Sequence, residues 1–404
     1  MTAKTFRKLM IPLAVAAAFG AAAPAGAAVF VQCPGDTNGD AAWTGTEVAP
    51  ANTTCMHLTA GDGFISMADG RPLYTFGFAD VTGKAPGTVM LDSLNAKFAA
   101  PNIELQEGKS FYLSLTNVSM AMRPDLFDPH TVHFHGYPQA APVFDGMPEG
   151  SFGVNMGSTV TYYYKLNDPG TYMYHCHQEA TEHMQMGMLG NLYVKPAQDG
   201  TTIGGYNKFV YNDGDGSTGY DKAFPLQLSS MDHVFHELHL GVQPLPFKNM
   251  KDTYTMINGR GYPDTVNPDP LPAPTEKVDY LGAGAESSQP IHALITATKG
   301  QRILLRLSNL SVTNYFTVTA QGLPMKVVGQ GARQLKGPDG KLLHYDTSSV
   351  TIGGGESVEV IIDTANADVA AGTYFLYTTN LNYLSNFDQD SGGMMTEIVI
   401  AAAP

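Results

Sequence analysis

The segment YMYHCHQEATEHMQMGM, residues 172–188, places three histidines, one cysteine and four methionines within seventeen residues. Its first part reads as a β-strand, in which successive side chains point to opposite faces of a sheet. His175 and His177 are therefore expected on one face, and Cys176 on the other. We expect this part of the chain to be a sheet with oxidisable or metal-binding side chains on both faces.

A second segment, HTVHFHG at residues 130–136, has the same alternation. His133 and His135 share one face, and His130 falls on the opposite face if the strand extends that far. The two segments together supply two sets of side chains. One set contains His130 and Cys176. The other set contains four imidazoles, those of His133, His135, His175 and His177.

The first set can be completed by His183 and Met188, which follow Cys176 in the sequence. Two imidazoles, one thiolate and a weak axial thioether are the ligands of a trigonal blue-copper site, called type 1. The four imidazoles of the other set suit a further copper. One alternative is a group of unrelated core histidines with a buried thiol, and another is a zinc site. The strand alternation and the axial methionine disfavour both.

The rest of the chain is typical of β-sandwiches. It contains 43 glycines and 26 prolines, and short strand-like segments are separated by turns. A strand beginning with Gly-Thr-Tyr occurs in each half, at residues 170–172 and 372–374, which indicates a weak internal repeat. We expect an all-β chain with two Greek-key β-sandwich domains, at residues 63–196 and 197–404.

The beginning of the chain is typical of an exported protein. Residues 1–27 combine a basic start, an Ala/Leu-rich run and a small-residue cleavage site, as in a secretory signal peptide. A membrane anchor is the alternative, but the apolar run is short. Residues 28–62 are expected to form a loop-rich extension with a Cys33–Cys55 disulfide, which leaves Cys176 unpaired. This predicts a periplasmic or secreted protein without a membrane span.

The formal net charge is −14, from 37 acidic and 23 basic residues. Removal of a signal peptide that carries only basic charges would make the chain still more acidic. Such a chain does not favour nucleic acid or an anionic membrane as a partner, because both repel negative charge. A basic partner protein remains compatible with this charge.

The two histidine-containing segments resemble the copper motifs of multicopper oxidases, the laccase-like proteins. FDGMPEG at 144–150 and MINGRGYP at 256–263 resemble further segments of that family. The resemblance implies a cupredoxin fold in each half and gives Asp145 a role in supplying protons during dioxygen reduction. An ordinary turn aspartate before Gly146 is the alternative. The resemblance to multicopper oxidases also implies two sets of copper ligands. The type 1 copper would be held by His130, Cys176, His183 and Met188, and the type 2/type 3 copper ligands would be His133, His135, His175 and His177.

Two features depart from the family pattern. Six residues separate Cys176 from His183, which is longer than the usual laccase spacing and shorter than in copper nitrite reductases. The family's trinuclear cluster takes four histidines from each of two domains, but YFTVTAQG at 315–322 and TYFLYTTN at 373–380 contain none. The histidines after residue 196 form no His-x-His pair; they are His233, His236, His239, His292 and His344.

Two groups of side chains have open interpretations. The histidines of DHVFHELH, residues 232–239, are spaced by three, so a helix would cluster them, whereas the alternative is a polar surface segment. Met184 and Met186 either pack around the copper site or form an additional Cu(I) entry site.

We expect an exported copper-dependent oxidoreductase that takes electrons from a small molecule, a metal ion or a redox protein and reduces dioxygen at a second copper site. Because the second half lacks ligands, the site would lie between subunits of a homo-oligomer, and a trimer is favoured. One alternative is a nitrite-reductase-like enzyme, although His133 stands where that family has a catalytic aspartate. The other is an electron-transfer or copper-binding protein with only the type 1 site.

Overall fold

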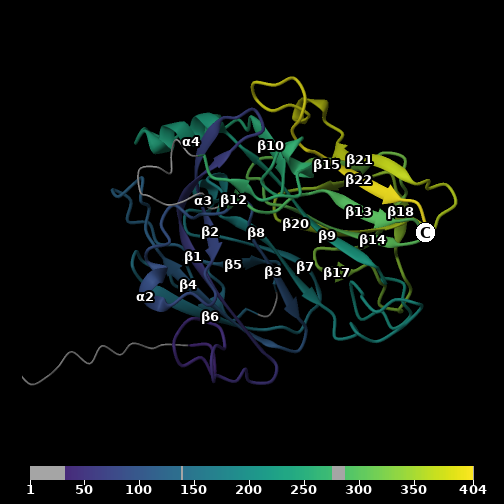
Figure 1. Cartoon of the computed structure of the whole chain (residues 1–404), viewed down its shortest axis with the longest axis horizontal. Coiled ribbons are helices and arrows are strands. Elements are labelled where there is room, and N and C mark those ends of the chain that lie inside the picture. The colour runs from purple at the N-terminus through teal and green to yellow at the C-terminus, as the bar shows by residue number, and fades with distance from the viewer. Residues whose placement is uncertain (1–31, 138–139, 275–286, 404) are drawn as a thin grey trace, which may run out of the picture. The chain divides into compact units, whose positions relative to one another are not determined.

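The computed structural model describes residues 32–137, 140–274 and 287–403, in which strands predominate and helices are few and short (Figure 1). The signal peptide expected at 1–27 lies outside these residues. None of the helices in the described part of the chain has the length and apolarity needed to cross a membrane.

The first half consists of two four-stranded sheets around one aromatic and aliphatic core. In the first sheet, strand β1 (Thr53–Ser66) pairs in parallel with β4 (Ser110–Asn117) and antiparallel with β2 (Pro72–Asp80). The order of this sheet is β2, β1, β4 and β6 (Thr159–Lys165). The second sheet has the order β3 (Ala100–Gln106), β8 (Leu189–Lys195), β7 (Gly170–His175) and β5 (His133–His135).

The second half repeats this design with a seven-stranded and a five-stranded sheet around its own core. The larger sheet has the order β10 (Tyr254–Ile257), β9 (Lys222–Met231), β14 (Arg302–Asn309), β20 (Glu356–Asp363), β16 (Met325–Gln330) and β17 (Arg333–Gln334), and β18 (Tyr345–Thr347) also pairs with β16. The smaller sheet has the order β13 (Ile295–Thr298), β22 (Met395–Ala401), β21 (Gly372–Thr378), β15 (Phe316–Ala320) and β19 (Ser349–Ile352). A separate ribbon pairs β11 (Leu271–Pro272) with β12 (Ser287–Gln289).

The helices are connectors between strands. The α-helices are α2 (Pro86–Val89), α3 (Ala180–Gln185) and α4 (His233–Leu240). The 3₁₀ turns are η1 (Pro142–Phe144), η2 (Phe247–Asn249), η3 (Asp264–Val266) and η4 (Leu381–Tyr383). Helix α4 begins after Asp232, whose side chain accepts hydrogen bonds from the amides of Val234 and Phe235 and so satisfies the free N–H groups of the first turn.

Strand β1 begins before the boundary expected between an extension (28–62) and the first domain (63–196). It pairs with β4 from Thr53 onward, so residues 53–62 belong to the first sheet. This segment contains Gly61 and Asp62, residue types that are uncommon in strands. In the structure, a Cβ at Gly61 would lie 2.8 Å from a Val118 methyl, so the glycine allows close packing. The carboxylate of Asp62 is buried, and it accepts hydrogen bonds from the Tyr74 hydroxyl and two backbone amides.

The loop before β1 is closed by the Cys33–Cys55 disulfide, which confirms the expected pairing. Cys176 is a free, buried cysteine. The bridge joins residues 22 positions apart and ties the segment from Gln32 onward to the first sheet.

Replacing both bridged cysteines, Cys33→Ala with Cys55→Ala, should lower the free energy of unfolding by about 3 kcal/mol, because the bridge limits the freedom of the unfolded chain. Urea unfolding of the variant and the oxidised parent measures the difference. A reduced parent serves as the control and should match the variant. Equal stability of the oxidised parent and the variant would contradict the expectation.

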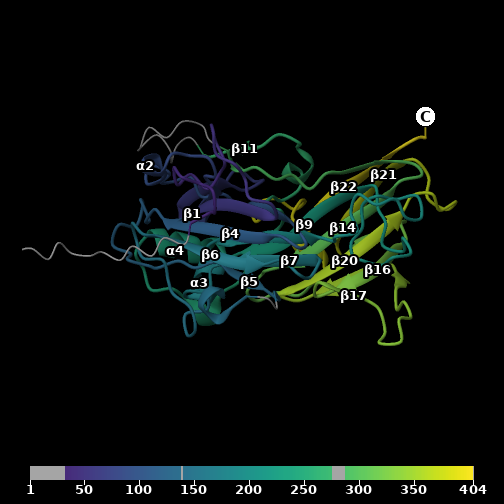
Figure 2. The same ribbon diagram turned by 90° about the horizontal axis from the view of Figure 1, so that it is seen from below.

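Strands β14 and β20 of the second half pack on β7, the strand that leads into the histidine-rich segment (Figure 2). Thr171 on β7 donates its amide to Glu359 Oε1 at 2.7 Å, and its carbonyl accepts the Ser357 hydroxyl at 2.7 Å. The buried guanidinium of Arg306 donates to the Thr171 hydroxyl at 3.0 Å. Burial raises the pKa of Glu359, and Arg306 opposes that rise. The second half therefore fixes the position of β7.

Candidate metal centre

Three side chains of the first set converge in the core of the first half. His130 is held by a short bridge in which its amide and carbonyl pair with those of Val154. Cys176 follows the last residue of β7, and His183 lies on α3. All three residues are completely buried. Segments more than forty residues apart in sequence thus bring two imidazoles and a thiol together.

The atoms that face one another in this set are those a metal would need. The Cys176 sulfur lies 3.9 Å from Nδ1 of His130 and 3.2 Å from Nδ1 of His183. The donor atoms of the three residues all lie within 4.8 Å of one another. The amide of Thr131 points at the sulfur from 3.4 Å, an arrangement that stabilises a thiolate.

The long spacing between Cys176 and His183 has a structural reason: it contains the start of α3. Glu179 adopts a left-handed conformation with φ of 47°, and its carbonyl accepts the His183 amide at 3.0 Å. The chain then returns to the strand, where the buried Met188 accepts the Cys176 amide through its carbonyl at 3.1 Å. Both His183 and Met188 therefore lie beside Cys176. Met188 as an axial ligand stays a prediction.

Electrostatics distinguishes the two imidazoles of the first set. Burial holds the pKa of His130 well below its usual value, so this ring is neutral, as a metal ligand must be. Burial also lowers the pKa of His183, but the Cys176 sulfur and Asp128 outweigh it and raise the pKa to about 10. The Cys176 sulfur and Asp128 therefore favour a positive charge at the His183 ring. A metal cation bound by the sulfur and the ring would supply that positive charge in place of the proton.

The second set lies at the ends of two paired strands: His133 and His135 on β5, His175 at the end of β7, and His177 two residues beyond it. Strand β5 pairs with β7 so that His133 stands opposite His175. Ring centroids are 5.3 Å apart for His133 and His175, 5.0 Å for His133 and His177, and 5.9 Å for His135 and His175. The structure thus makes the four predicted histidine rings neighbours, although among the predicted ligands only the first set has three donor atoms within 4.8 Å of one another.

Backbone carbonyls orient two of these rings. Nδ1 of His133 is 2.6 Å from the Asp145 carbonyl, and Nδ1 of His175 is 2.8 Å from the Cys176 carbonyl. A carbonyl only accepts, so each Nδ1 carries the proton and each Nε2 keeps its lone pair for a metal. Burial lowers the pKa of His175 to about 3 and also lowers the pKa of His133, so both rings are neutral at pH 7.

The structure places Asp145 at the second set. Besides its carbonyl contact, its carboxylate Oδ1 lies 3.5 Å from Nδ1 of His133. The next residue, Gly146, has a φ of +74°, and a Cβ there would lie 2.2 Å from the Val132 carbonyl oxygen. The turn therefore needs glycine to approach β5. The role of Asp145 in proton supply stays a prediction.

The three histidines of residues 232–239 lie on a helix, α4, as their spacing predicted. His233, His236 and His239 are buried, so the alternative of a polar surface segment is wrong. Nδ1 of His236 is 2.6 Å from the Tyr74 carbonyl, and Nε2 is 3.0 Å from the Gln185 carbonyl. These rings pack α4 onto the first half.

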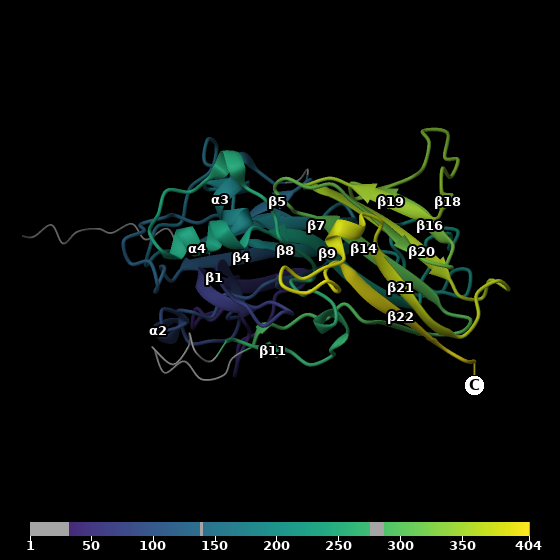
Figure 3. The same ribbon diagram turned by 90° about the horizontal axis from the view of Figure 1, so that it is seen from above.

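His239 is likewise engaged within the chain. Its Nε2 lies 2.8 Å from Glu182 on α3, and its Nδ1 lies 3.0 Å from the Arg123 guanidinium. Helices α3 and α4 are neighbours in Figure 3 as well. Because both ring nitrogens of His236 and of His239 have partners, these two histidines are poor candidates for ligands of another subunit; His233 has a partner at one ring nitrogen, the Thr253 hydroxyl at 2.9 Å from Nδ1.

Met186 is completely buried in the core of the first half, and Met184 packs against a neighbouring buried cluster. These contacts favour packing over a Cu(I) entry site.

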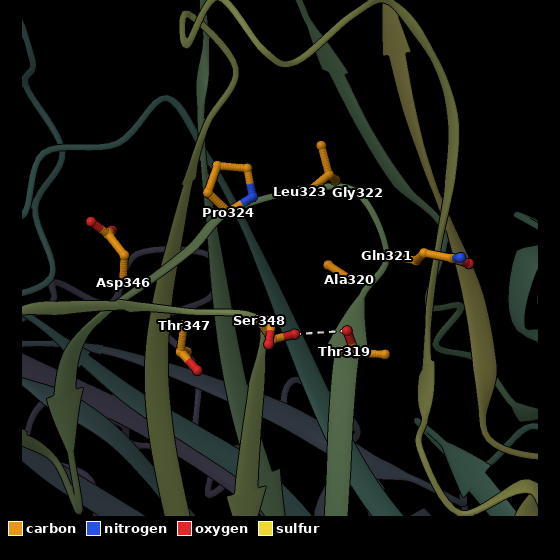
Figure 4. A pocket seen from close by; sticks show the side chains of 9 residues that line it. All are labelled: Thr319, Ala320, Gln321, Gly322, Leu323, Pro324, Asp346, Thr347 and Ser348. Carbon is orange, nitrogen blue, oxygen red and sulfur yellow. Dashed lines mark hydrogen bonds between the residues drawn. The ribbon is translucent and has the colours of Figure 1, made fainter.

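A surface hollow lies in the second half, between the β15–β16 connection and the β18–β19 region (Figure 4). It is lined by residues 319–324 and 346–348 and contains no histidine or cysteine. It is therefore no candidate for the predicted metal site.

Two imidazole nitrogens and one sulfur, held in a β-sandwich with a buried methionine beside them, define a copper protein of the cupredoxin type. The chain belongs to the multicopper oxidase family. Two family models, both described as multicopper oxidase, match residues 80–199 and 230–398. Copper is the cofactor for which this donor set is suited.

Sequence relatives include oxidases of plants and a bacterial copper protein. L-ascorbate oxidase of Cucurbita pepo var. melopepo is 26% identical over 313 residues, which cover 72% of this chain and 50% of that protein. Copper resistance protein A of Pseudomonas syringae pv. tomato is 23% identical over 286 residues, which cover 67% of this chain and 42% of that protein. The chain thus spans about half the length of these relatives.

Solved structures share the fold. Blue copper oxidase from Nitrosomonas europaea has a TM-score of 0.61 at 24% identity, with 85% of each chain covered. Copper nitrite reductase from Nitrosomonas europaea has a TM-score of 0.55 at 15% identity, with 85% of this chain and 93% of that chain covered. These similarities confirm the cupredoxin architecture expected for both halves.

Proposed function

We propose that this protein is a copper-dependent oxidoreductase that takes electrons from a donor at the first set of ligands and reduces dioxygen at the second. The observation that carries the proposal is the position of Cys176. Its sulfur belongs to the first set, while its carbonyl accepts the Nδ1 proton of His175 in the second. One residue therefore connects the two sets through covalent bonds and a single hydrogen bond.

The first set is proposed as the electron-accepting site. His130, Cys176 and His183 would hold a copper ion through two imidazoles and a thiolate, and Met188 would add a weak thioether donor. Copper held by such ligands exchanges single electrons with little rearrangement. Complete burial of the three residues keeps water from the sulfur, so the thiolate is protected from unwanted oxidation.

The second set is proposed as the dioxygen-reducing site. His133, His135, His175 and His177 present four imidazoles to one region, with two rings oriented by carbonyls. Reduction of dioxygen to water consumes four electrons and four protons. We assign the supply of protons to Asp145: its carboxylate lies 3.5 Å from His133 and is partly exposed, so that it can exchange protons with solvent.

The remaining ligands of the second site are proposed to come from another copy of the chain. The second half contains no His-x-His pair, and His236 and His239 of α4 are occupied within the chain. We favour the histidine-bearing face of a partner copy as the source of the missing imidazoles. This supports a homo-oligomer, for which we favour a trimer. A disulfide supports a periplasmic or secreted location.

Two other functions remain as competing outcomes. A nitrite-reductase-like enzyme fits the fold, but His133 occupies the position expected for its catalytic aspartate. An electron-transfer protein with only the first site fits the lack of histidine pairs in the second half.

Dioxygen uptake by the copper-loaded protein, together with its mass in solution, tests the proposal. With ferrous ion or a phenol as the donor, an oligomer should consume one dioxygen for every four electrons donated. The Cys176→Ser variant is the control and should be inactive. A copper-loaded monomer without dioxygen uptake would leave the electron-transfer function, and reduction of nitrite in place of dioxygen would support the nitrite-reductase-like one.

A further inference from the structure

A glycine of the second half lies directly against one histidine of the second set. Gly355 has a φ of +86°, and a Cβ at this position would lie 2.7 Å from Cε1 and 2.9 Å from Nε2 of His135. These separations are shorter than any real Cβ contact. The ring of His135 can therefore occupy its place only because residue 355 has no side chain.

The turn that carries Gly355 is rigidly held. Its amide donates to the carbonyl of Asn309, at the end of β14, at 2.8 Å. The turn is closed from Gly353, whose amide donates to the Glu356 carboxylate at 2.7 Å and whose carbonyl accepts the Glu356 amide at 3.1 Å. A side chain at residue 355 would therefore displace the His135 ring more readily than the turn.

The turn is also connected to the strands that carry the site. It leads into β20, where Ser357 and Glu359 hold Thr171 on β7. Strand β7 in turn pairs with β5, with His135 opposite Met173. The contact between Gly355 and His135 is thus one end of a continuous attachment of the second half to the histidine-bearing sheet.

The contact is polar as well as steric. Burial lowers the pKa of His135, and a hydrogen bond with the Gly355 backbone opposes that effect. His133 and His175 are held in a similar way by carbonyls of the first half. For His135, the corresponding backbone group comes from the second half.

We propose that Gly355 is a positioning residue of the second copper site, and that its turn seats the His135 ring facing the other three imidazoles. This inference rests on the proposed function, because it requires the second set to bind copper. The second half then contributes a rigid backbone surface to the site of its own chain. That contribution explains how a half without histidine pairs can still be required for copper binding.

Gly355→Ala tests the proposal, with Gly340→Ala as the matched control. Gly340 has a similar φ of +83° but open space around its Cβ position, so both variants share the backbone strain and only one meets a ring. Gly355→Ala should retain the thiolate absorption of the first site and bind copper at the second about 10- to 100-fold more weakly. Gly340→Ala should match the parent in both. Metal titration and visible absorption of the same samples give these quantities.

A double variant keeps the test decisive if Gly355→Ala folds poorly. With His135→Ala as the background, the added alanine meets no ring, so Gly355→Ala should cause no further loss of copper and should cost only the stability that Gly340→Ala costs through backbone strain. A Gly355→Ala protein with full second-site copper, or a Gly355→Ala change that costs more stability than Gly340→Ala even in the His135→Ala background, would overturn the positioning role alone. A parent protein with one copper per chain would overturn both this role and the proposed function.

Discussion

Cys176→Ser is expected to abolish the intense visible absorption of the Cu(II)-loaded protein. That absorption comes from charge transfer between a thiolate and copper, and Cys176 is the only cysteine of the chain outside the disulfide. A serine hydroxyl at the same place supplies no thiolate. Dioxygen uptake should fall at least 100-fold, because electrons would no longer enter through the first site.

Met184→Leu is the matched control for this variant. Met184 lies one residue after His183 and packs in the core without belonging to the proposed ligands. The control should retain both the absorption and the activity. A Cys176→Ser protein that keeps its colour would show that the thiolate is not the ligand, and the first site would have to be reassigned.

His135→Ala is expected to separate the two sites. The variant should keep the thiolate absorption, since none of the first-set ligands changes. It should lose copper from the second site and at least 100-fold in dioxygen uptake, because one of four imidazoles is removed. Metal analysis and dioxygen uptake measure the two losses on one preparation.

His344→Ala provides the control for removing a histidine. His344 lies in the second half and is not among the proposed ligands. Its variant should match the parent in copper content and in dioxygen uptake. An active His135→Ala protein with undiminished copper would show that the second set serves no catalytic purpose.

Much of the metal centre followed from the two-residue period of strands. That period placed His133, His135 and His175 on one face and Cys176 on the other, and the pairing of β5 with β7 agrees with it. The disulfide followed from an odd number of cysteines in a chain for which export was expected. In both cases a local rule, strand alternation or cysteine pairing, determines the outcome.

Other features depend on contacts between distant segments, which local patterns do not encode. Strand β1 runs through Gly61 and Asp62, which are unfavourable in strands; partners as far along the chain as Met122 compensate for them. The histidines of α4 look polar in the sequence, yet they are buried because polar groups of other segments lie against their ring nitrogens: backbone carbonyls at His236, Glu182 and Arg123 at His239, and Thr253 at His233.

The role of Gly355 was also missed at the sequence level. Three consecutive glycines at residues 353–355 were a visible signal of close backbone packing. The partner of Gly355, however, is more than two hundred residues away in the chain, so the pattern alone could not identify His135.

The copper content of the copper-loaded wild-type protein, measured with its thiolate absorption on the same sample, tests the central claim most directly. Two occupied sets of ligands predict more than one copper per chain, with a single equivalent accounting for the absorption. One copper per chain, all of it contributing to the absorption, would contradict the claim of a second copper site.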